Sequence, residues 1–131
     1  MLTKYKLAPQ TKFYDSMGAN WKPFIMFSQF PNLRSKFCNT DVNGLRFNEY
    51  SNKNKSNSIF EESLNENKKK AVIIGNSFSF GEGASSDSQT ISSLLSKNSD
   101  YHFYNLSGRG FSGFQEITNF FLHLNHLKNI K

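Results

Sequence analysis

A serine that directly follows a short apolar run is the feature of this sequence with the clearest chemical potential. Residues 71–74, Ala-Val-Ile-Ile, are apolar and mostly β-branched, and Gly75-Asn76-Ser77 comes next. A short, continuous apolar run is typical of a buried strand in a parallel sheet. Ligands of open α/β sheets bind beyond the carboxyl ends of the strands. The pattern therefore makes Ser77 a candidate nucleophile at that edge.

A second loop, rich in glycine, is predicted to complete the chemistry. Gly108, Gly110 and Gly113 follow a second candidate strand, and glycines let backbone N–H groups approach a ligand closely. A serine beside convergent N–H donors is the minimum arrangement for acyl transfer, because it offers a nucleophile and an oxyanion hole. Arg109, in the same loop, is either a group that attracts an anionic substrate or an exposed turn residue.

The residues before and between these two loops have the pattern of a strand, a helix and a second strand. After the serine loop, residues 85–88 offer several helix N-caps, and the apolar residues of 91–95 follow at helical spacing to an end near 97–98. Residues 101–106 then predict a second strand. Such units are almost always right-handed crossovers between parallel strands. The loops at 75–83 and 107–113 should therefore face each other across one crevice.

Other glycine-loop motifs do not fit. A Rossmann fingerprint needs closely spaced glycines directly after the strand, whereas five residues separate Gly75 from Gly81. A Walker A loop needs Gly-Lys-Ser/Thr, and no lysine occurs between Lys70 and Lys97. The nucleophile elbow of α/β hydrolases needs a glycine two places after the serine, where Ser79 stands.

The two loops resemble the first two conserved blocks of the GDSL/SGNH hydrolases. Residues 73–83, Ile-Ile-Gly-Asn-Ser-Phe-Ser-Phe-Gly-Glu-Gly, look like the first block, and residues 104–113, Tyr-Asn-Leu-Ser-Gly-Arg-Gly-Phe-Ser-Gly, look like the second. The resemblance implies that Ser77 is the nucleophile and that the N–H groups of Ser77 and Gly110 form the oxyanion hole. It implies a flavodoxin-like three-layer α/β/α sandwich with a parallel sheet. It further implies hydrolysis of a small-molecule or carbohydrate ester without a cofactor or metal.

Two features depart from that family. Asn76 stands where the family usually has Asp, a change that keeps the size and one acceptor. The family's Gly-x-Asn-Asp and Asp-x-x-His blocks have no counterpart before Lys131, and His123 and His126 are predicted to face solvent. Loss of a triad member typically costs on the order of a millionfold in turnover. We therefore expect an incomplete, truncated hydrolase, nearly inactive as an esterase, whose open sheet edge favours self-association or a C-terminal partner.

The chain divides, by composition, into an irregular N-terminal extension (1–69) and the hydrolase-like part (70–131). Phe24–Phe27 could form a strand bounded by prolines, and Asn43-Gly44 predicts a tight turn in a hairpin or bulged loop. Residues 48–70 read as a polar linker. Its few apolar residues are expected to form a short surface helix: Ile59, Phe60 and Leu64.

A second amphipathic helix is predicted over residues 114–127. Its apolar residues fall on one stripe, which should face the core: Phe114, Ile117, Phe121 and Leu124. His102, in the second predicted strand, is interpreted as a packing or surface group. Asp87 is interpreted as an acidic residue that interacts favourably with a helix N-terminus.

The composition of the chain bears on which kinds of partner and metal site to expect. The chain has 131 residues and a formal net charge of +6, but its lysines are scattered. The densest cluster, Lys68-Lys69-Lys70, directly precedes the predicted strand, so we interpret it as solvated and predict no nucleic-acid partner. Cys38 is the only cysteine, which excludes an intrachain disulfide and any multi-cysteine zinc site. With no signal peptide or membrane span evident, we expect a soluble, cytoplasmic protein without a membrane partner.

Two other functions remain open on the sequence. One is a non-catalytic binding or interaction remnant of the same fold, which the missing base favours. The other is a flavodoxin-like nucleotide binder, motivated by the glycine loops and Arg109.

Overall fold

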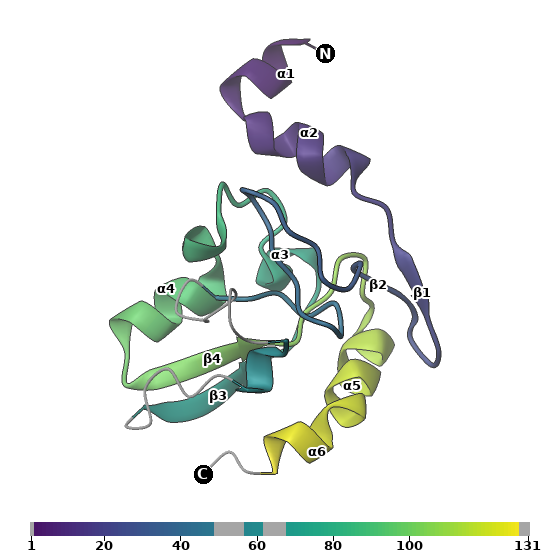
Figure 1. Ribbon diagram of the computed structural model, residues 1–131, viewed down its shortest axis with the longest axis vertical. Coiled ribbons are helices and arrows are strands. Elements are labelled where there is room, and N and C mark those ends of the chain that lie inside the picture. The colour runs from purple at the N-terminus through teal and green to yellow at the C-terminus, as the bar shows by residue number, and fades with distance from the viewer. Residues whose placement is uncertain (1, 49–56, 62–67, 129–131) are drawn as a thin grey trace.

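The computed structural model describes residues 2–48, 57–61 and 68–128, and the fold is mixed α/β (Figure 1). Its centre is a parallel pair of strands, β3 (Lys69–Ile73) and β4 (Tyr101–Asn105), in register from Lys69 opposite Tyr101 to Ile73 opposite Asn105. Helix α4 (Ile91–Asn98) connects them and lies beside β4. The other elements are α1 (Leu2–Leu7), α2 (Pro9–Ser16), β1 (Asn20–Lys22), β2 (Met26–Ser28), η1 (Ile59–Glu61), α3 (Ser77–Phe80), η2 (Asp87–Gln89), α5 (Gly113–Leu122) and α6 (Leu124–Leu127).

The predicted strand–helix–strand unit is confirmed, with two differences. Thr90 caps α4 by accepting a hydrogen bond from the Ser93 N–H, because residues 87–89 form a separate 3₁₀ turn ahead of the helix. Strand β3 was expected to be buried, yet each of its residues keeps some exposure. The reason is that, in the described part of the chain, β3 pairs with β4 alone.

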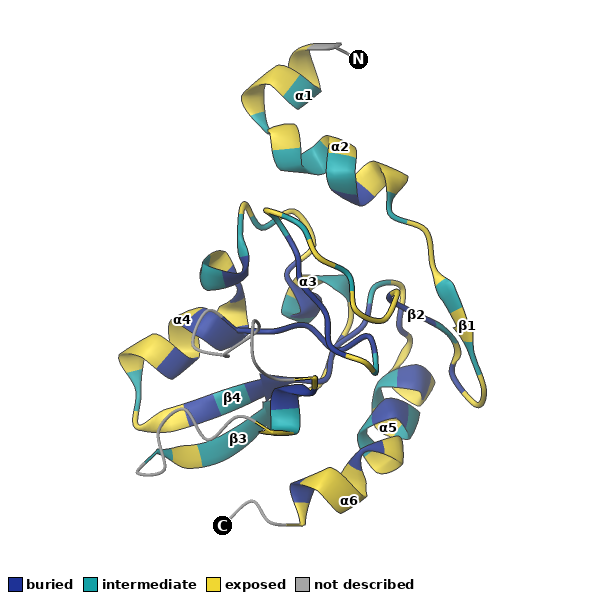
Figure 2. Cartoon of the chain, in the orientation of Figure 1, coloured by how far each residue is buried: buried dark blue, intermediate teal, exposed yellow. Residues whose placement is uncertain are grey.

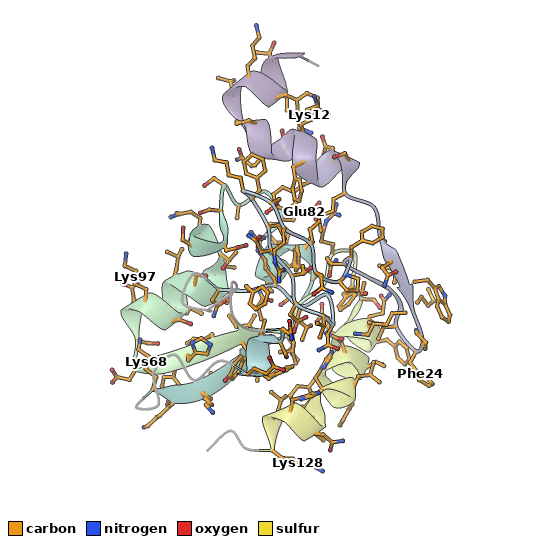
Figure 3. The ribbon with its side chains drawn as sticks, viewed as in Figure 1. Lys12, Phe24, Lys68, Glu82, Lys97 and Lys128 are labelled. Carbon is orange, nitrogen blue, oxygen red and sulfur yellow. The ribbon has the colours of Figure 1, made fainter. Side chains whose placement is uncertain are left out.

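The N-terminal part is more regular than its sequence predicts. Helices α1 and α2, which project from the rest of the molecule, were not expected (Figure 1). The strand expected at Phe24–Phe27 begins at Met26, because residues 23–25 form the turn that brings β2 against β1. Phe24 extends outward from that turn (Figure 3).

The turn predicted at Asn43-Gly44 is confirmed. Gly44 has a φ of 80°, and Thr40 bridges Arg46 in antiparallel fashion. Arg46 also bridges Asn105, so this hairpin lies along the side of β4 that faces away from β3. The hairpin and the β4 segment share the main apolar core with one residue each of η1 and α6: Leu45, Phe47, Tyr104 and Leu106, then Ile59 and Leu127.

The predicted polar linker lies largely outside the described residues, as does Leu64. In its described part, Ile59–Glu61 forms a 3₁₀ turn, and Ile59 is buried in the core instead of lying on the surface. Among the described helices, none has the length and apolar character needed to cross a membrane.

Helix α5 presents the opposite face to the one predicted. Phe114 and Phe121, on the apolar stripe, are 72% and 62% exposed, whereas Gln115 and Asn119 are buried (Figure 2). The buried amides explain the orientation. Gln115 donates to the Ile25 carbonyl at 3.0 Å, and Asn119 donates to the Leu106 carbonyl at 2.7 Å. Buried carbonyls need such partners, so hydrogen bonding selects the polar face.

Helix α4 also buries polar residues and leaves apolar ones partly exposed. Its buried residues are Ser92, Ser93 and Ser96, and its partly exposed ones are Ile91, Leu94 and Leu95. The Ser92 hydroxyl donates to the Asn48 side chain at 2.8 Å, and the Ser96 hydroxyl accepts from the Phe103 N–H at 2.9 Å. Small hydroxyl residues thus let the helix approach β4 closely while satisfying its polar groups.

The inverted face of α5 gives a direct stability prediction. Asn119→Ala leaves the Leu106 carbonyl buried without its partner, so the free energy of unfolding should fall by about 1–3 kcal/mol. Phe121→Ser, on the exposed stripe, should leave it nearly unchanged. Urea unfolding of the two variants beside wild type measures both. If Phe121→Ser costs more than Asn119→Ala, the apolar stripe is the buried face and the orientation described here is wrong.

Candidate functional site

Ser77 is the first residue of the short helix α3, immediately beyond the carboxyl end of β3. Asn76 caps this helix, because its side-chain oxygen accepts from the Phe78 N–H at 3.1 Å. Gly81 ends it in the left-handed conformation, with a φ of 87°, and donates to the Ser77 carbonyl at 3.1 Å. The N–H of a first helical residue has no acceptor within the helix. This local geometry leaves the Ser77 N–H without an acceptor inside the helix.

The serine loop and the glycine loop meet, as their predicted places at the sheet edge require. The Gly108 N–H donates to the Gly75 carbonyl at 3.0 Å, directly after the last ladder bond of the sheet. The Asn105 amide donates to the Ser79 carbonyl at 3.0 Å, and its oxygen accepts from the Ser107 N–H at 3.1 Å. Asn105 therefore joins the end of β4 to both loops.

A pocket of about 290 Å³ opens between these loops and the N-terminal segment. Its lining comes from three parts of the chain: Met17, Gly18, Ala19, Phe27, Gln29, Glu82, Arg109 and Gly110. Ser77 is not part of the lining, but Glu82, which is, donates its N–H to the Ser77 carbonyl at 2.9 Å. The pocket thus reaches Gly110 and the end of the serine loop.

Arg109 connects the N-terminal helices to the serine loop. Its guanidinium donates to the Met17 carbonyl at 2.8 Å and to the Tyr14 carbonyl at 3.0 Å, and it forms an ion pair with Glu82 at 2.8 Å. Neither of the two sequence interpretations included these contacts. Attraction of an anionic substrate by Arg109 stays a prediction, and the Glu82 carboxylate weakens the field that such an anion would meet.

A buried ion pair, which the sequence analysis did not predict, holds the serine loop from the other side. Arg46 is fully buried and contacts Asp87 at 3.1 Å. The same guanidinium donates to the Gly81 carbonyl at 2.8 Å and to the Phe37 carbonyl at 2.6 Å. The Asn39 amide donates to Asp87 at 2.6 Å. Asp87 is therefore the buried partner of a cation and an amide, beyond the helix-terminal role predicted for it.

Among the described residues, no hydrogen bond joins the Ser77 hydroxyl to a histidine or a carboxylate. His102 packs edge-on against Tyr104, with ring centres 4.9 Å apart, and burial lowers its pKa. His126 is exposed, as predicted, and stacks on Phe60 with ring centres 5.0 Å apart.

The prediction that His123 faces solvent is wrong. The residue is 4% exposed, because the chain turns at His123 between α5 and α6 where one continuous helix was predicted. Neither ring nitrogen has a hydrogen-bond partner among the described residues. Burial, together with nearby Lys22 and His126, lowers the pKa of His123 to about 4, so the ring is neutral at pH 7.

The single thiol is also buried. Cys38 lies in a small apolar cluster with Tyr14 and Phe80, and burial raises its pKa to about 12. A protonated, buried thiol is a poor nucleophile. No group of three or more His, Cys, Asp or Glu residues that could hold a metal occurs in the part of the chain that the structure describes.

Comparison of the chain with models of known protein families, and with curated proteins, gives no match. The functional argument therefore depends on the geometry of Ser77, Gly110 and the loops around them.

The burial of His123 predicts a pH dependence of stability. The folded state binds a proton there only near pH 4, whereas the unfolded chain binds it near pH 6.5. Stability is therefore full above pH 6.5 and is lost as the pH falls from 6.5 towards 4. Because each pKa unit is worth about 1.4 kcal/mol, the loss is about 3 kcal/mol.

His123→Gln removes this titration, so its stability should fall by about 3 kcal/mol less than that of wild type between pH 7 and pH 4. Urea unfolding at both pH values measures the difference, and other titrating groups cancel in the comparison. His126→Gln, on the exposed ring, is the control and should behave as wild type does. Equal losses in wild type and His123→Gln would show that His123 titrates normally.

Proposed function

We propose that this chain carries the nucleophile and oxyanion half of an SGNH-type serine hydrolase that acts on carboxylic esters. The observation that carries the proposal is the position of Ser77: it begins a helix at the carboxyl end of a parallel strand, and the glycine loop is hydrogen-bonded to that same turn. An N–H without a helical acceptor beside a hydroxyl matches what acyl transfer needs.

In the proposed reaction the Ser77 Oγ attacks the acyl carbonyl carbon while a base takes the hydroxyl proton. The carbonyl oxygen becomes an oxyanion that accepts hydrogen bonds from the N–H groups of Ser77 and Gly110. Its collapse expels the alcohol, which takes the proton from the base. Water, activated by the same base, then cleaves the acyl-serine and releases the acid.

The base in this proposal comes from a polypeptide that covers the free edge of β3. Two features support a partner. In the described residues β3 pairs on one side only, and α4 and α5 turn apolar residues outward. Contiguous exposed apolar surface is typical of protein interaction sites. Added strands would extend the parallel sheet, and the three-layer flavodoxin-like sandwich belongs to the same proposal.

Chemical rescue tests the role of Ser77. A fluorophosphonate should label the chain slowly, and imidazole should accelerate labelling by about tenfold, since a positioned base contributes ~10²–10⁴-fold and a free one recovers part of it. Ser77→Ala should abolish the imidazole-dependent labelling, as intact mass would show. Ser85→Ala, an exposed serine farther along the same loop, is the matched control and should label as wild type does. Equal labelling of wild type and Ser77→Ala would show that Ser77 is not the nucleophile.

A second candidate is a non-catalytic module that binds another polypeptide through its exposed apolar residues. The outward apolar faces of α4 and α5 favour it, because they support a partner whether or not Ser77 reacts. The labelling experiment separates the two: Ser77 labelling that imidazole accelerates favours the hydrolase, and its absence favours the binding module.

A further inference from the structure

Helix α5 carries a stripe of large apolar side chains that no described element covers. Phe114, Ile117 and Phe121 follow one another at helical spacing, and they are 72%, 54% and 62% exposed. The opposite face of the helix is fixed inward by Gln115 and Asn119, whose amides donate to buried carbonyls. The stripe cannot turn into the core without breaking these hydrogen bonds, so it stays at the surface of the folded chain.

The turn between β1 and β2 adds to this apolar surface (Figure 1). It lies beside the first turn of α5, because Gln115 donates to the Ile25 carbonyl at 3.0 Å. The residues on either side of Ile25, Phe24 and Met26, are 77% and 63% exposed. Both have a positive φ, 68° and 67°, which is uncommon for residues other than glycine. The turn thus keeps a strained conformation that presents two large apolar side chains to the outside.

The size of this surface fits a protein interface. The five residues named so far as exposed are called the α5 surface: Phe24, Met26, Phe114, Ile117 and Phe121. Because one aromatic side chain can bury ~150–250 Å², and each of the five is more than half exposed, together they offer on the order of 600 Å². Two such surfaces in contact would bury about 1,200 Å², the lower limit of the ~1,200–2,000 Å² found in specific interfaces.

The charge distribution favours a protein partner over a membrane or a nucleic acid. The chain has a formal net charge of +6, yet residues 111–127 contain one residue with a formal charge, Glu116, and residues 21–28 contain Lys22 alone. Apolar surfaces that bind anionic lipid are bordered by lysine and arginine, and sites for single-stranded nucleic acid combine aromatic residues with a basic groove. The cores of protein interfaces are instead poor in charge and rich in aromatic residues and methionine, as the α5 surface is.

The spacing of the stripe favours a second copy of the chain as that partner. Ile117 lies three residues after Phe114 and four before Phe121, which is about 4.5 Å and 6 Å along the helix axis. The stripe is therefore nearly symmetric about Ile117. When two copies of α5 cross in antiparallel fashion about a two-fold axis at this residue, Phe114 of each faces Phe121 of the other. Two-fold dimers, in which one surface pairs with itself, are the commonest oligomers.

We propose that two copies of this chain associate through the α5 surface about a two-fold axis at Ile117, so that Phe114 of each copy packs against Phe121 of the other. An interface of this small area gives a dissociation constant on the order of 10 μM. A dimer adds stability only above that concentration, so unfolding measured well below it reports the single chain. The proposal does not depend on the hydrolase, because the α5 surface includes neither Ser77 nor Gly110. For the binding module, it names the polypeptide that covers α5.

Sedimentation velocity tests the association. Over about 1 to 300 μM, a range that spans the expected constant, wild type should change from monomer to dimer. Ile117→Asp places two carboxylates next to each other at the axis, so it should raise the dissociation constant about tenfold or more. Leu94→Asp, at a partly exposed leucine of α4, is the matched control and should associate as wild type does. The proposal is overturned if wild type stays monomeric throughout, or if Ile117→Asp associates as well as wild type, as it would through the free edge of β3.

Cysteine cross-linking tests the position of the axis. Helices packed ~8–10 Å apart bring facing Cα atoms within the ~4.4–6.8 Å of a disulfide, so Ile117→Cys should form a disulfide-linked dimer under mild oxidation. Wild type should not, because burial raises the pKa of its only thiol, Cys38, to about 12. Leu94→Cys is the control and should cross-link much more slowly on a non-reducing gel. If Ile117→Cys cross-links no faster than Leu94→Cys, the axis does not lie at Ile117 and the proposal is wrong.

These outcomes are separate from those of the labelling experiment. A dimer whose Ser77 does not react with the fluorophosphonate supports the α5 surface and contradicts the hydrolase. A monomer whose Ser77 reacts retains the hydrolase and overturns the dimer.

Discussion

The buried pair of Arg46 and Asp87 is the interaction on which the rest of this structure depends. One guanidinium reaches the turn that follows the candidate nucleophile, the carbonyl of Phe37 and the carboxylate of Asp87. Its planar group also lies over the rings of Tyr14 and Phe80, at 5.9 and 5.3 Å from their centres. Loss of one partner of a buried ion pair typically costs about 3–5 kcal/mol. The pair thus makes the N-terminal segment and the serine loop one packed unit.

These contacts also fix the N-terminal segment next to the candidate site. Tyr14 donates to the Ala84 carbonyl, and Gln115 in α5 donates to the Ile25 carbonyl. Contacts of this kind cross the boundary at residues 69 and 70 that composition suggests. The pocket beside Gly110 exists because residues 17–29 are held against the two loops. The N-terminal segment therefore forms one wall of that pocket, opposite Glu82, Arg109 and Gly110.

The strand–helix–strand unit can be predicted from the sequence, because the patterns that indicate it lie within each element or directly beside it. An apolar run, a group of capping residues and a second apolar run were enough to predict β3, α4 and β4. Which face of α5 is buried could not be predicted in this way. The stripe of Phe114, Ile117 and Phe121 indicates which face is apolar, but the carbonyl that draws Gln115 inward belongs to Ile25, 90 residues away. Periodicity does not report such distant hydrogen bonds.

The same limit applies to the site. Residue types near Ser77 predicted its place beyond the end of a strand and the meeting of the two loops. The role of Arg46 could not be predicted, because three of the groups it binds, in Phe80, Gly81 and Asp87, lie 34 to 41 residues farther along the chain. Its one local signal is its position between Leu45 and Phe47, both of which are buried. A charged residue between two core residues on a short hairpin is a reason to search for a buried counter-charge.

Amide hydrogen exchange in Arg46→Lys tests most directly whether this arginine holds the serine loop. Lysine keeps the charge but cannot form the planar set of hydrogen bonds. The N–H groups of Gly81 and Glu82, which both donate to the Ser77 carbonyl, should exchange tenfold or more faster relative to the Leu106 N–H, which bonds to Ile73 at the end of the sheet. Lys12→Met, at an exposed residue of α2, should leave that ratio unchanged. If Arg46→Lys accelerates the three amides equally, or none of them, Arg46 does not hold the loop.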